Sequence, residues 1–254
     1  MKTYAVITGA SAGIGKEFAK LLAVKGYGLI LVARREERLK HLASELSVEC
    51  EIIAADLGQE EECYKVYEQI KDKNIHIFIN NAGFGDCGNF LQTNLDKELD
   101  MIEVNIKAVH IFTKLMLRKM QIQNRGYILN VSSSAGLMPA GPYMATYYAT
   151  KAYIASMTRA VAKELRNAHS NVYIGCLCPG PVDTEFNQVA NVEFALKGIR
   201  ADECAKYALK QMEKKKVVII PTMKMKLAIT SGRFLPTKAY ISIASHQQRK
   251  KFQK

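Results

Sequence analysis

The sequence predicts a single α/β domain, in which a doubly wound parallel sheet of seven strands carries helices on both faces. Short apolar runs rich in Val and Ile recur along the chain, as expected of strands that are buried on both faces. Stretches of helical periodicity separate these runs, so strand and helix alternate as in βαβ units. The 254 residues, 48% of them hydrophobic, suffice for one such domain with a sizeable core.

Each expected strand is a run of four to six residues, and each expected helix follows one of these runs. The strands are expected at Tyr4–Thr8, Gly28–Ala33, Glu51–Ala55, His76–Asn80, Tyr127–Val131, Val172–Leu177 and Val217–Ile220. The helices are expected at Gly15–Lys25, Glu36–Leu46, Glu60–Asp72, Leu95–Gln121, Tyr147–Ala168 and Ala201–Lys214.

No linker, repeat or low-complexity segment interrupts this alternation, so residues 1–221 are assigned to one domain. Residues 222–254 form a basic, amphipathic extension that is not an independent domain. Its helical parts are short because Pro236 breaks them. The extension could pack on the body, cover a substrate cleft or rest on a membrane surface.

The composition argues against a membrane-spanning or secreted protein. No apolar run approaches the ~20 residues that span a bilayer. The start of the chain leads directly into the first strand, so we expect a cytoplasmic protein without a signal peptide.

The six cysteines contain no Cys-x-x-Cys pair, which favours reduced thiols and no metal site. Cys176 and Cys178 alternate on a strand and are expected to face the same side.

The formal net charge of +12 lies mainly near the C-terminus. A solvated basic tail is the plain interpretation, and a weak contact with an anionic membrane surface or an acidic partner is the alternative. No recognition motif accompanies the charge, so a nucleic-acid partner is not expected.

The first strand is followed by a glycine-rich turn from Thr8 to Gly15, which opens the first helix. Gly9 can adopt backbone angles closed to other residues. Gly13 lets a pyrophosphate approach the backbone, and Gly15 lets helix and strand pack closely. The free N–H groups and the positive end of the helix would then face the phosphates of a dinucleotide. The spacing is G-x-x-x-G-x-G rather than G-x-G-x-x-G.

The second strand ends in Arg34-Arg35, where an NAD-binding protein usually carries Asp or Glu to bind the ribose hydroxyls. Two guanidinium groups suit a 2′-phosphate instead, because they bind it through charge-assisted hydrogen bonds. The hydroxyl of Ser11 could add a further hydrogen bond. The expected cofactor is therefore NADP(H).

Two further strand ends carry polar residues. Asp56-Leu57 closes the third strand, and the carboxylate could accept a hydrogen bond from an adenine amino group. Asn80-Asn81-Ala82-Gly83 closes the fourth, where the amides can tie neighbouring backbone together and leave room for the adenine-side ribose. Ligands bind at these carboxyl ends in doubly wound sheets.

Tyr147 and Lys151 stand four residues apart on an expected helix and therefore share one face. A phenol has a reference pKa near 10. A Lys cation about 5 Å away would favour the phenolate by roughly 3 kcal/mol at an effective dielectric near 20. We expect this to lower the pKa of Tyr147 towards the range useful for proton transfer. Ser132, Ser133 and Ser134 close the fifth strand, and any of them could hydrogen-bond a substrate oxygen.

In these motifs the chain resembles the short-chain dehydrogenases/reductases, a superfamily with a Rossmann fold and a Tyr-x-x-x-Lys active site. The resemblance covers residues 3 to 221. It rests on T-G-x-x-x-G-I-G, D-L, N-N-A-G, V-N, S-S-x-A-G, Y-x-x-x-K and P-G-P-V-x-T, which occur in the family's order and spacing.

The resemblance implies a role for each matching residue. Ser133 orients the substrate carbonyl, and Tyr147 is the general acid in reduction and the general base in oxidation. Lys151 lowers the pKa of Tyr147 and bonds the nicotinamide ribose, and Asn105 holds a water that links Lys151 to solvent. Val182 and Thr184 contact the nicotinamide carboxamide. The other cofactor-binding residues would be Gly9, Ser11, Gly13, Ile14, Gly15, Arg34, Arg35, Asp56, Leu57, Asn81, Ala82, Gly83, Pro179 and Gly180.

Substrate specificity in this family resides in the segments after Thr184 and near residues 137–143. Here they offer an apolar lining, which favours a hydrophobic ketone or alcohol such as a hydroxysteroid or a bile acid. The expected substrate-binding residues are Ser133, Leu137, Tyr143, Tyr147 and Phe186.

Two other functions are open: a 3-oxoacyl thioester reductase, whose acidic carrier or CoA would meet the positive C-terminal third, and a cofactor-sensing protein that does no chemistry. Retention of Asn105, Ser133, Tyr147 and Lys151 argues against the latter. Family members pair through their long helices, so a homodimer or homotetramer is expected.

Overall fold

A parallel sheet of seven strands forms the centre of the molecule. The computed structural model describes residues 2–190, 198–232 and 234–249. The strand order is β3-β2-β1-β4-β5-β6-β9, and every pairing is parallel. Its strands are β1 Tyr4–Thr8, β2 Gly28–Ala33, β3 Cys50–Ala54, β4 Ile75–Asn80, β5 Tyr127–Val131, β6 Tyr173–Leu177 and β9 Val218–Ile219. The expected fold class is therefore confirmed, with the limits of all seven strands within one residue of those expected.

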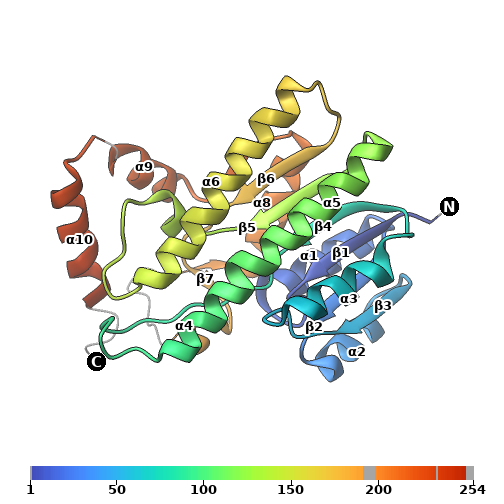
Figure 1. Cartoon of the computed structure of the whole chain (residues 1–254), viewed down its shortest axis with the longest axis horizontal. Coiled ribbons are helices and arrows are strands. Elements are labelled where there is room, and N and C mark those ends of the chain that lie inside the picture. The colour runs from blue at the N-terminus through green and yellow to red at the C-terminus, as the bar shows by residue number, and fades with distance from the viewer. Residues whose placement is uncertain (1, 191–197, 233, 250–254) are drawn as a thin grey trace.

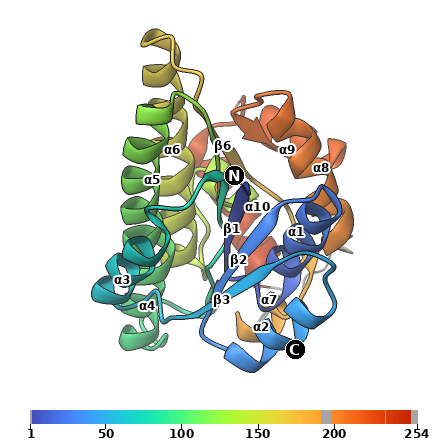
Figure 2. The ribbon, with the colours of Figure 1, turned by 90° about the vertical axis from the view of Figure 1, so that its right-hand side faces the viewer.

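Helices cover both faces of the sheet. Figure 2 shows α3, α5 and α6 on one side of the strands and α1, α2 and α8 on the other. These helices are α1 Gly13–Val24, α2 Glu36–Ser44, α3 Glu60–Ile70, α5 Val109–Gln123, α6 Ala145–Asn167 and α8 Ala201–Glu213.

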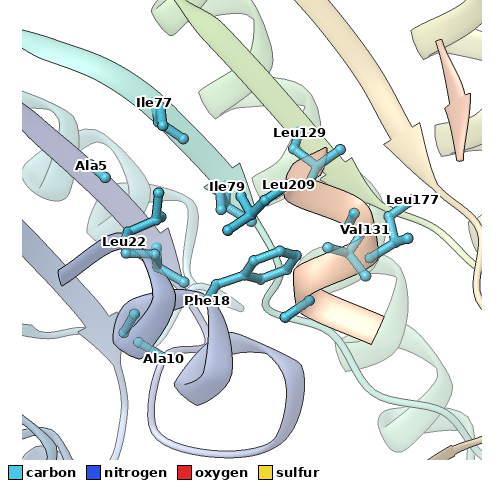
Figure 3. Packing of buried hydrophobic residues seen from close by; sticks show 14 of the residues in the cluster. Ala5, Ala10, Phe18, Leu22, Ile77, Ile79, Leu129, Val131, Leu177 and Leu209 are labelled. Carbon is cyan, nitrogen blue, oxygen red and sulfur yellow. The ribbon is translucent and has the colours of Figure 1, made fainter. Parts of the chain in front are cut away.

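The core under α1 and α8 is wholly apolar. Phe18 and Leu22 share one face of α1 and are at most 1% exposed. Figure 3 shows Phe18 between the strand residues Ile79 and Leu129 and Leu209 of α8. Burial of such side chains is worth roughly 1.5–3 kcal/mol each, so this face fixes where α1 and the turn before it lie.

The opposite face contains a buried polar network as well as an apolar core. The Asn80 amide donates to Oδ1 of Asn130 at 2.8 Å and to Oγ1 of Thr113 at 3.2 Å. Asn130 in turn donates to Oγ1 of Thr158 at 3.0 Å. Buried amides need such partners, so the network fixes α5 and α6 against the ends of β4 and β5.

The expected helix over Leu95–Gln121 is interrupted. It comprises α4 (Leu95–Ile102), a π-helical stretch η1 (Glu103–Ala108) and α5. Periodicity did not reveal the π stretch, because one extra residue per turn hardly changes an amphipathic pattern. Also missed were a 3₁₀ turn η2 (Ser134–Leu137), a helix α7 (Phe186–Val189) and a short parallel pair β7–β8 (Val182–Asp183 with Ile199–Arg200).

The C-terminal extension forms two helices, α9 (Met223–Gly232) and α10 (Thr237–Arg249). Figure 1 shows both, in red, at the end of the molecule remote from the N-terminus. A Cβ on Gly232 would collide with the ring of Tyr240, so the two helices are in close contact. Residues 250–254, three of which are Lys, lie outside the described residues.

Candidate active site

A cavity of about 840 Å³ lies at the carboxyl ends of the strands β1 to β6. It is the place where doubly wound sheets bind ligands. The expected site residues that line it are Gly9, Ser11, Gly13, Ile14, Arg34, Arg35, Asp56, Leu57, Asn81, Ala82, Gly83, Ser133, Tyr147, Lys151, Pro179, Gly180, Val182, Thr184 and Phe186.

The glycine turn has the geometry that a dinucleotide requires. Gly9 and Gly13 have φ values of 65° and 54°, in the region that favours glycine. A Cβ on Gly15 would collide with the carbonyl oxygen of Gly9, so Gly15 permits close packing of helix and turn but does not itself line the cavity. Within the described residues no side chain caps the first amides of α1. These N–H groups therefore fit a pyrophosphate.

Asn81 ties the end of β4 to the glycine turn, as its position predicted. Its amide donates to the carbonyl oxygens of Thr8 and Gly9 at 3.0 and 3.1 Å. The Thr8 hydroxyl accepts hydrogen bonds from the backbone N–H of Asn81 and of Ala82, at 2.9 and 3.0 Å. The turn is thus held in place before any ligand binds, which lowers the entropic cost of binding.

Two of the three residues proposed for a 2′-phosphate, Arg35 and Ser11, meet at one corner of the cavity, and the third, Arg34, lines the same cavity. The Arg35 guanidinium donates to Oγ of Ser11 at 3.3 Å. It also donates to the Glu185 carboxylate at 3.0 Å, and Arg38 donates to the same carboxylate at 2.6 and 2.8 Å. Arg38 and Arg35 lower the pKa of Glu185. Sequence reasoning missed Arg38 and Glu185, because ion pairs between distant segments leave no local pattern.

Asp56 lies at the end of β3 and lines the same part of the cavity. Its Oδ1 accepts a hydrogen bond from the backbone N–H of Gly58 at 3.1 Å. The carboxylate therefore closes the turn into α3 and still has acceptor positions that can face an adenine.

The structure resolves which of the three serines lies at the phenol. The Ser133 side chain lies at the phenol of Tyr147, where it favours the phenolate, and its Oγ accepts a hydrogen bond from the backbone N–H of Ala135 at 3.2 Å. The hydroxyl of Ser132 instead donates to the carbonyl oxygen of Lys151 at 2.7 Å. Ser134 begins the 3₁₀ turn η2.

The expected effect of Lys151 on Tyr147 is wrong for the protein without ligands. Burial raises the pKa of Tyr147 to about 12, and the neighbouring Ser133 offsets this only in part. Burial also lowers the pKa of Lys151 to about 8. The ammonium lies 5.8 Å from the centre of the phenol ring and donates to the carbonyl oxygen of Val131 at 3.1 Å. Desolvation opposes the charged form of both groups and is the largest cause of both pKa shifts.

Asn105 lies in the π-helical stretch η1 and is fully buried, outside the lining of the cavity. Its Nδ2 donates to the carbonyl oxygen of Phe84 at 2.9 Å and to Oγ1 of Thr150 at 3.1 Å. Its Oδ1 accepts from the N–H of Phe84 at 3.0 Å. The side chain therefore joins η1 to the segment after β4 and to α6, one residue before Lys151.

The substrate end of the cavity differs from its prediction. Phe186 lines it, with its ring centre 5.5 Å from that of Tyr147. Leu137 and Tyr143 are not among the lining residues, and the Tyr143 hydroxyl accepts hydrogen bonds from Arg249. Their place is taken by the C-terminal extension, whose lining residues are Met225, Ala228, Ser231, Gly232, Leu235, Tyr240, Ile243, Ala244, Gln247 and Gln248. Of the three roles open for the extension, the structure shows packing on the body and covering of the cavity.

The part of the chain that the structure describes contains no candidate metal centre. His, Cys, Asp and Glu residues do not gather there as metal ligands would. Cys176 and Cys178 face the same side, with their sulfurs 3.8 Å apart and without a disulfide. None of the described helices is both long and apolar enough to cross a membrane.

The chain belongs to the short chain dehydrogenase family, whose model matches residues 3–193. A very-long-chain 3-oxoacyl-CoA reductase of Anas platyrhynchos is 33% identical over 200 residues, which are 75% of this chain and 63% of that protein. The inactive hydroxysteroid dehydrogenase-like protein 1 of Homo sapiens is 34% identical over 195 residues, 74% of this chain and 58% of that protein. The chain thus spans about three fifths of the length of these relatives.

A solved relative covers nearly the whole fold. The short-chain dehydrogenase from Sphingobium yanoikuyae, in complex with NADPH, is 28% identical with a TM-score of 0.82. The similarity covers 92% of this chain and 94% of that one. The family model and this structural similarity agree on the short-chain dehydrogenase fold for the chain.

Proposed function

We propose that the protein is an NADP(H)-dependent reductase that interconverts a hydrophobic ketone and its secondary alcohol, with a hydroxysteroid or a bile acid as the favoured substrate class. The observation that carries this proposal is the position of Tyr147. Its phenol lies with Ser133 in one cavity, between a dinucleotide-type turn and an apolar chamber. A carbonyl bound there would meet a proton donor and a cofactor at the same time.

The corner formed by Arg35 and Ser11 supports NADP(H) over NAD(H). A guanidinium and a hydroxyl 3.3 Å apart offer a phosphate several donors. The acidic residue that would bind a 2′-hydroxyl is absent from the end of β2, where Arg34 and Arg35 stand. Glu185 neutralises Arg35 until a phosphate displaces it.

The residues divide the reaction between them. NADPH, held by the glycine turn and by Arg35 and Ser11, would supply the hydride for the carbonyl carbon. Ser133 and Tyr147 donate hydrogen bonds to the substrate oxygen, and Tyr147 gives it a proton as the oxygen gains negative charge. Lys151 holds a positive charge near the phenolate that remains, and the apolar tail helices exclude water.

In the free protein the phenol of Tyr147 is protonated, which is the form that donates a proton during reduction. Burial raises the pKa of Tyr147 to about 12, so the phenol carries its proton throughout the neutral range. A protonated phenol is the form that reduction requires at its start, whereas oxidation must first remove that proton.

A spectrophotometric screen tests the function. NADPH oxidation at 340 nm would be followed with 3-, 7- and 17-ketosteroids, simple aliphatic ketones and acyl thioesters, each at matched concentrations. We expect turnover with ketosteroids and better catalytic efficiency with NADPH than with NADH. Absence of turnover with every carbonyl compound would reject the enzymatic function and favour the cofactor-sensing alternative, to which the inactive human relative draws attention.

A 3-oxoacyl thioester reductase is the second candidate, and two observations favour it. One curated relative reduces very-long-chain 3-oxoacyl-CoA, according to its name. A groove of about 520 Å³ on α10 is lined by Lys238, His246 and Arg249, which could meet the phosphates of CoA. A 3-oxoacyl-CoA should then be used far better than the same acyl group on N-acetylcysteamine, which lacks phosphates. Equal use of both thioesters would show that the groove on α10 does not contribute to CoA recognition.

We also propose that the chain forms a homodimer or a homotetramer. Helix α4 exposes Leu95, Leu99 and Ile102 by 66%, 50% and 37%, and Tyr153 of α6 is 38% exposed. Apolar side chains gathered on neighbouring helices suit an interface. Light scattering after gel filtration measures the assembly, and a monomer at micromolar concentration would contradict it.

A further inference from the structure

The tail helix α10 places a polar side chain inside the apolar chamber. Gln248 is 3% exposed and lines the cavity, although its neighbours along the same wall are mostly apolar. Burying an amide costs free energy unless hydrogen bonds replace those it made with water. Gln248 should therefore have hydrogen-bond partners for both its amide nitrogen and its amide oxygen.

Only half of that amide is satisfied. Nε2 of Gln248 donates to the hydroxyl of Tyr148 at 2.6 Å, whereas Oε1 has no hydrogen-bond partner among the described residues. A buried acceptor without a partner costs roughly 1–3 kcal/mol. Rotating the amide by 180° exchanges the two atoms and still leaves one of them unpaired. The unpaired atom belongs to a side chain that lines the substrate end of the cavity.

Tyr148 completes the polar group. Its hydroxyl accepts the proton of Gln248, and its own proton has only the sulfur of Met138, at 4.0 Å, among the described residues. The pair therefore offers one strong acceptor and one available donor. The Tyr148 ring centre lies 6.4 Å from that of Tyr147, so the pair stands apart from the reacting atoms but in the same chamber.

No charge accompanies this pair in the described lining. All charged lining residues are Arg34, Arg35, Asp56, Lys151 and Glu185, which belong to the cofactor end or to the catalytic group. A carboxylate or a phosphate would lose its hydration there without gaining a counter-charge. A neutral group that both donates and accepts a hydrogen bond satisfies the site.

We propose that Gln248 and Tyr148 form a substrate subsite that binds a hydroxyl group remote from the reacting carbonyl. The hydroxyl donates to Oε1 of Gln248 and accepts from Tyr148. This inference rests on the proposed function, because it describes a second contact of the same ketone substrate. It narrows that substrate to a hydrophobic hydroxyketone and gives the tail helix a recognition role in addition to covering the cavity.

Matched ketone pairs test the subsite. The probes are 2-alkanones of 8 to 14 carbons with their ω-hydroxy counterparts, and 5α-androstan-3-one with its 17β-hydroxy derivative. Dissociation constants on the NADP⁺-loaded protein come from calorimetry, and kcat/KM comes from NADPH oxidation. We expect the hydroxylated member to be preferred at one range of chain length or in the steroid pair, by about tenfold or more.

Variants separate recognition from structure. Gln248→Leu and Tyr148→Phe should remove the preference for the hydroxylated probe and leave the plain ketone unaffected or better bound. Gln69→Leu, an exposed position on α3, is the matched control and should retain the preference. NADPH binding should be unchanged in all three variants.

The outcomes distinguish this inference from the proposed function. Tighter binding of hydroxylated probes without any turnover would support the subsite and reject the reductase. Turnover without a hydroxyl preference in any pair would overturn the subsite and leave the reductase intact. An equal loss for both members of each pair in Gln248→Leu would show a purely structural role, and failure of every probe to bind would reject both.

Discussion

The two ends of the cavity are built differently. At the cofactor end, backbone amides, glycines and charged side chains follow the ends of β1 to β3, and the apolar core under α1 fixes them. At the substrate end, apolar side chains from α9 and α10 close the chamber, and these helices follow the last strand of the sheet. The first end is determined by the sheet, and the second by how a tail packs on it.

The cofactor end of the cavity therefore supports the reaction, and the substrate end determines which substrate is bound. Residues that a cofactor needs stand on short turns after strands, where the register of the sheet fixes their positions. Residues that select the substrate come from a segment that can change its side chains without disturbing the sheet. Substitutions at the first end should therefore affect chemistry, stability and cofactor binding, whereas those at the second should affect substrate choice.

The largest effect is expected from Tyr147→Phe. The substitution removes the proton donor, which should lower kcat by roughly 10³-fold or more, while the dissociation constant for NADPH stays within about twofold. Steady-state kinetics and fluorescence titration of NADPH measure the two quantities. Tyr64→Phe, exposed on α3, is the control. Turnover near the parent level would contradict the role of Tyr147.

Gly15→Ala tests how strictly the cofactor end is packed. Its Cβ would collide with the carbonyl oxygen of Gly9, a backbone atom that cannot rotate away. We expect a loss of about 3 kcal/mol in the free energy of unfolding and weaker NADPH binding. Denaturant unfolding measures the loss. Gly58→Ala is the matched control, since the nearest atom to its Cβ lies at 3.4 Å. Equal stability of the two variants would refute this packing argument.

Lys151→Met tests the cost of burying an ammonium. Burial lowers the pKa of Lys151 from 10.5 to about 8, so between these pH values the unfolded chain binds a proton that the folded chain lacks. The contribution of Lys151 to stability therefore rises with pH across this window. The cofactor-free variant should exceed the parent by up to about 3 kcal/mol below pH 8.

That difference should shrink towards pH 10.5, where the folded parent has lost the proton and only about half of the unfolded chains still hold it. Denaturant unfolding of both chains at pH 7 and pH 10.5 provides the measurement. A difference that does not depend on pH would show that lost packing or the lost hydrogen bond to Val131, rather than charge burial, determines the effect.

The smallest effect is expected at the phosphate corner. Arg35→Ala should weaken NADPH binding about tenfold, since hydrogen bonds to charged groups are worth about 1.5–3 kcal/mol, and should leave NADH binding nearly unchanged. Glu185→Gln should strengthen NADPH binding, because it removes the carboxylate that pairs with Arg35. Calorimetric titration with both cofactors checks this, and a parallel change for NADH would argue against a 2′-phosphate site.

The sequence by itself determined the sheet and most of the cofactor end. Apolar runs such as Gly28–Ala33 are strands because burial on both faces selects Val, Ile and Leu. The glycines and the Tyr147–Lys151 pair were also readable, since turn geometry and helical spacing are local properties of the chain. Each of these features depends on residues close together in sequence.

Only the tertiary structure decided the pKa of Tyr147, the pairing of Glu185 with Arg35 and Arg38, and the composition of the substrate end. Leu137 and Tyr143 were expected in the chamber, but α10 lies there and brings Gln248 instead. Desolvation, ion pairing and cavity shape depend on groups up to about 150 residues apart in sequence. Such quantities arise when the chain packs, and no local pattern encodes them.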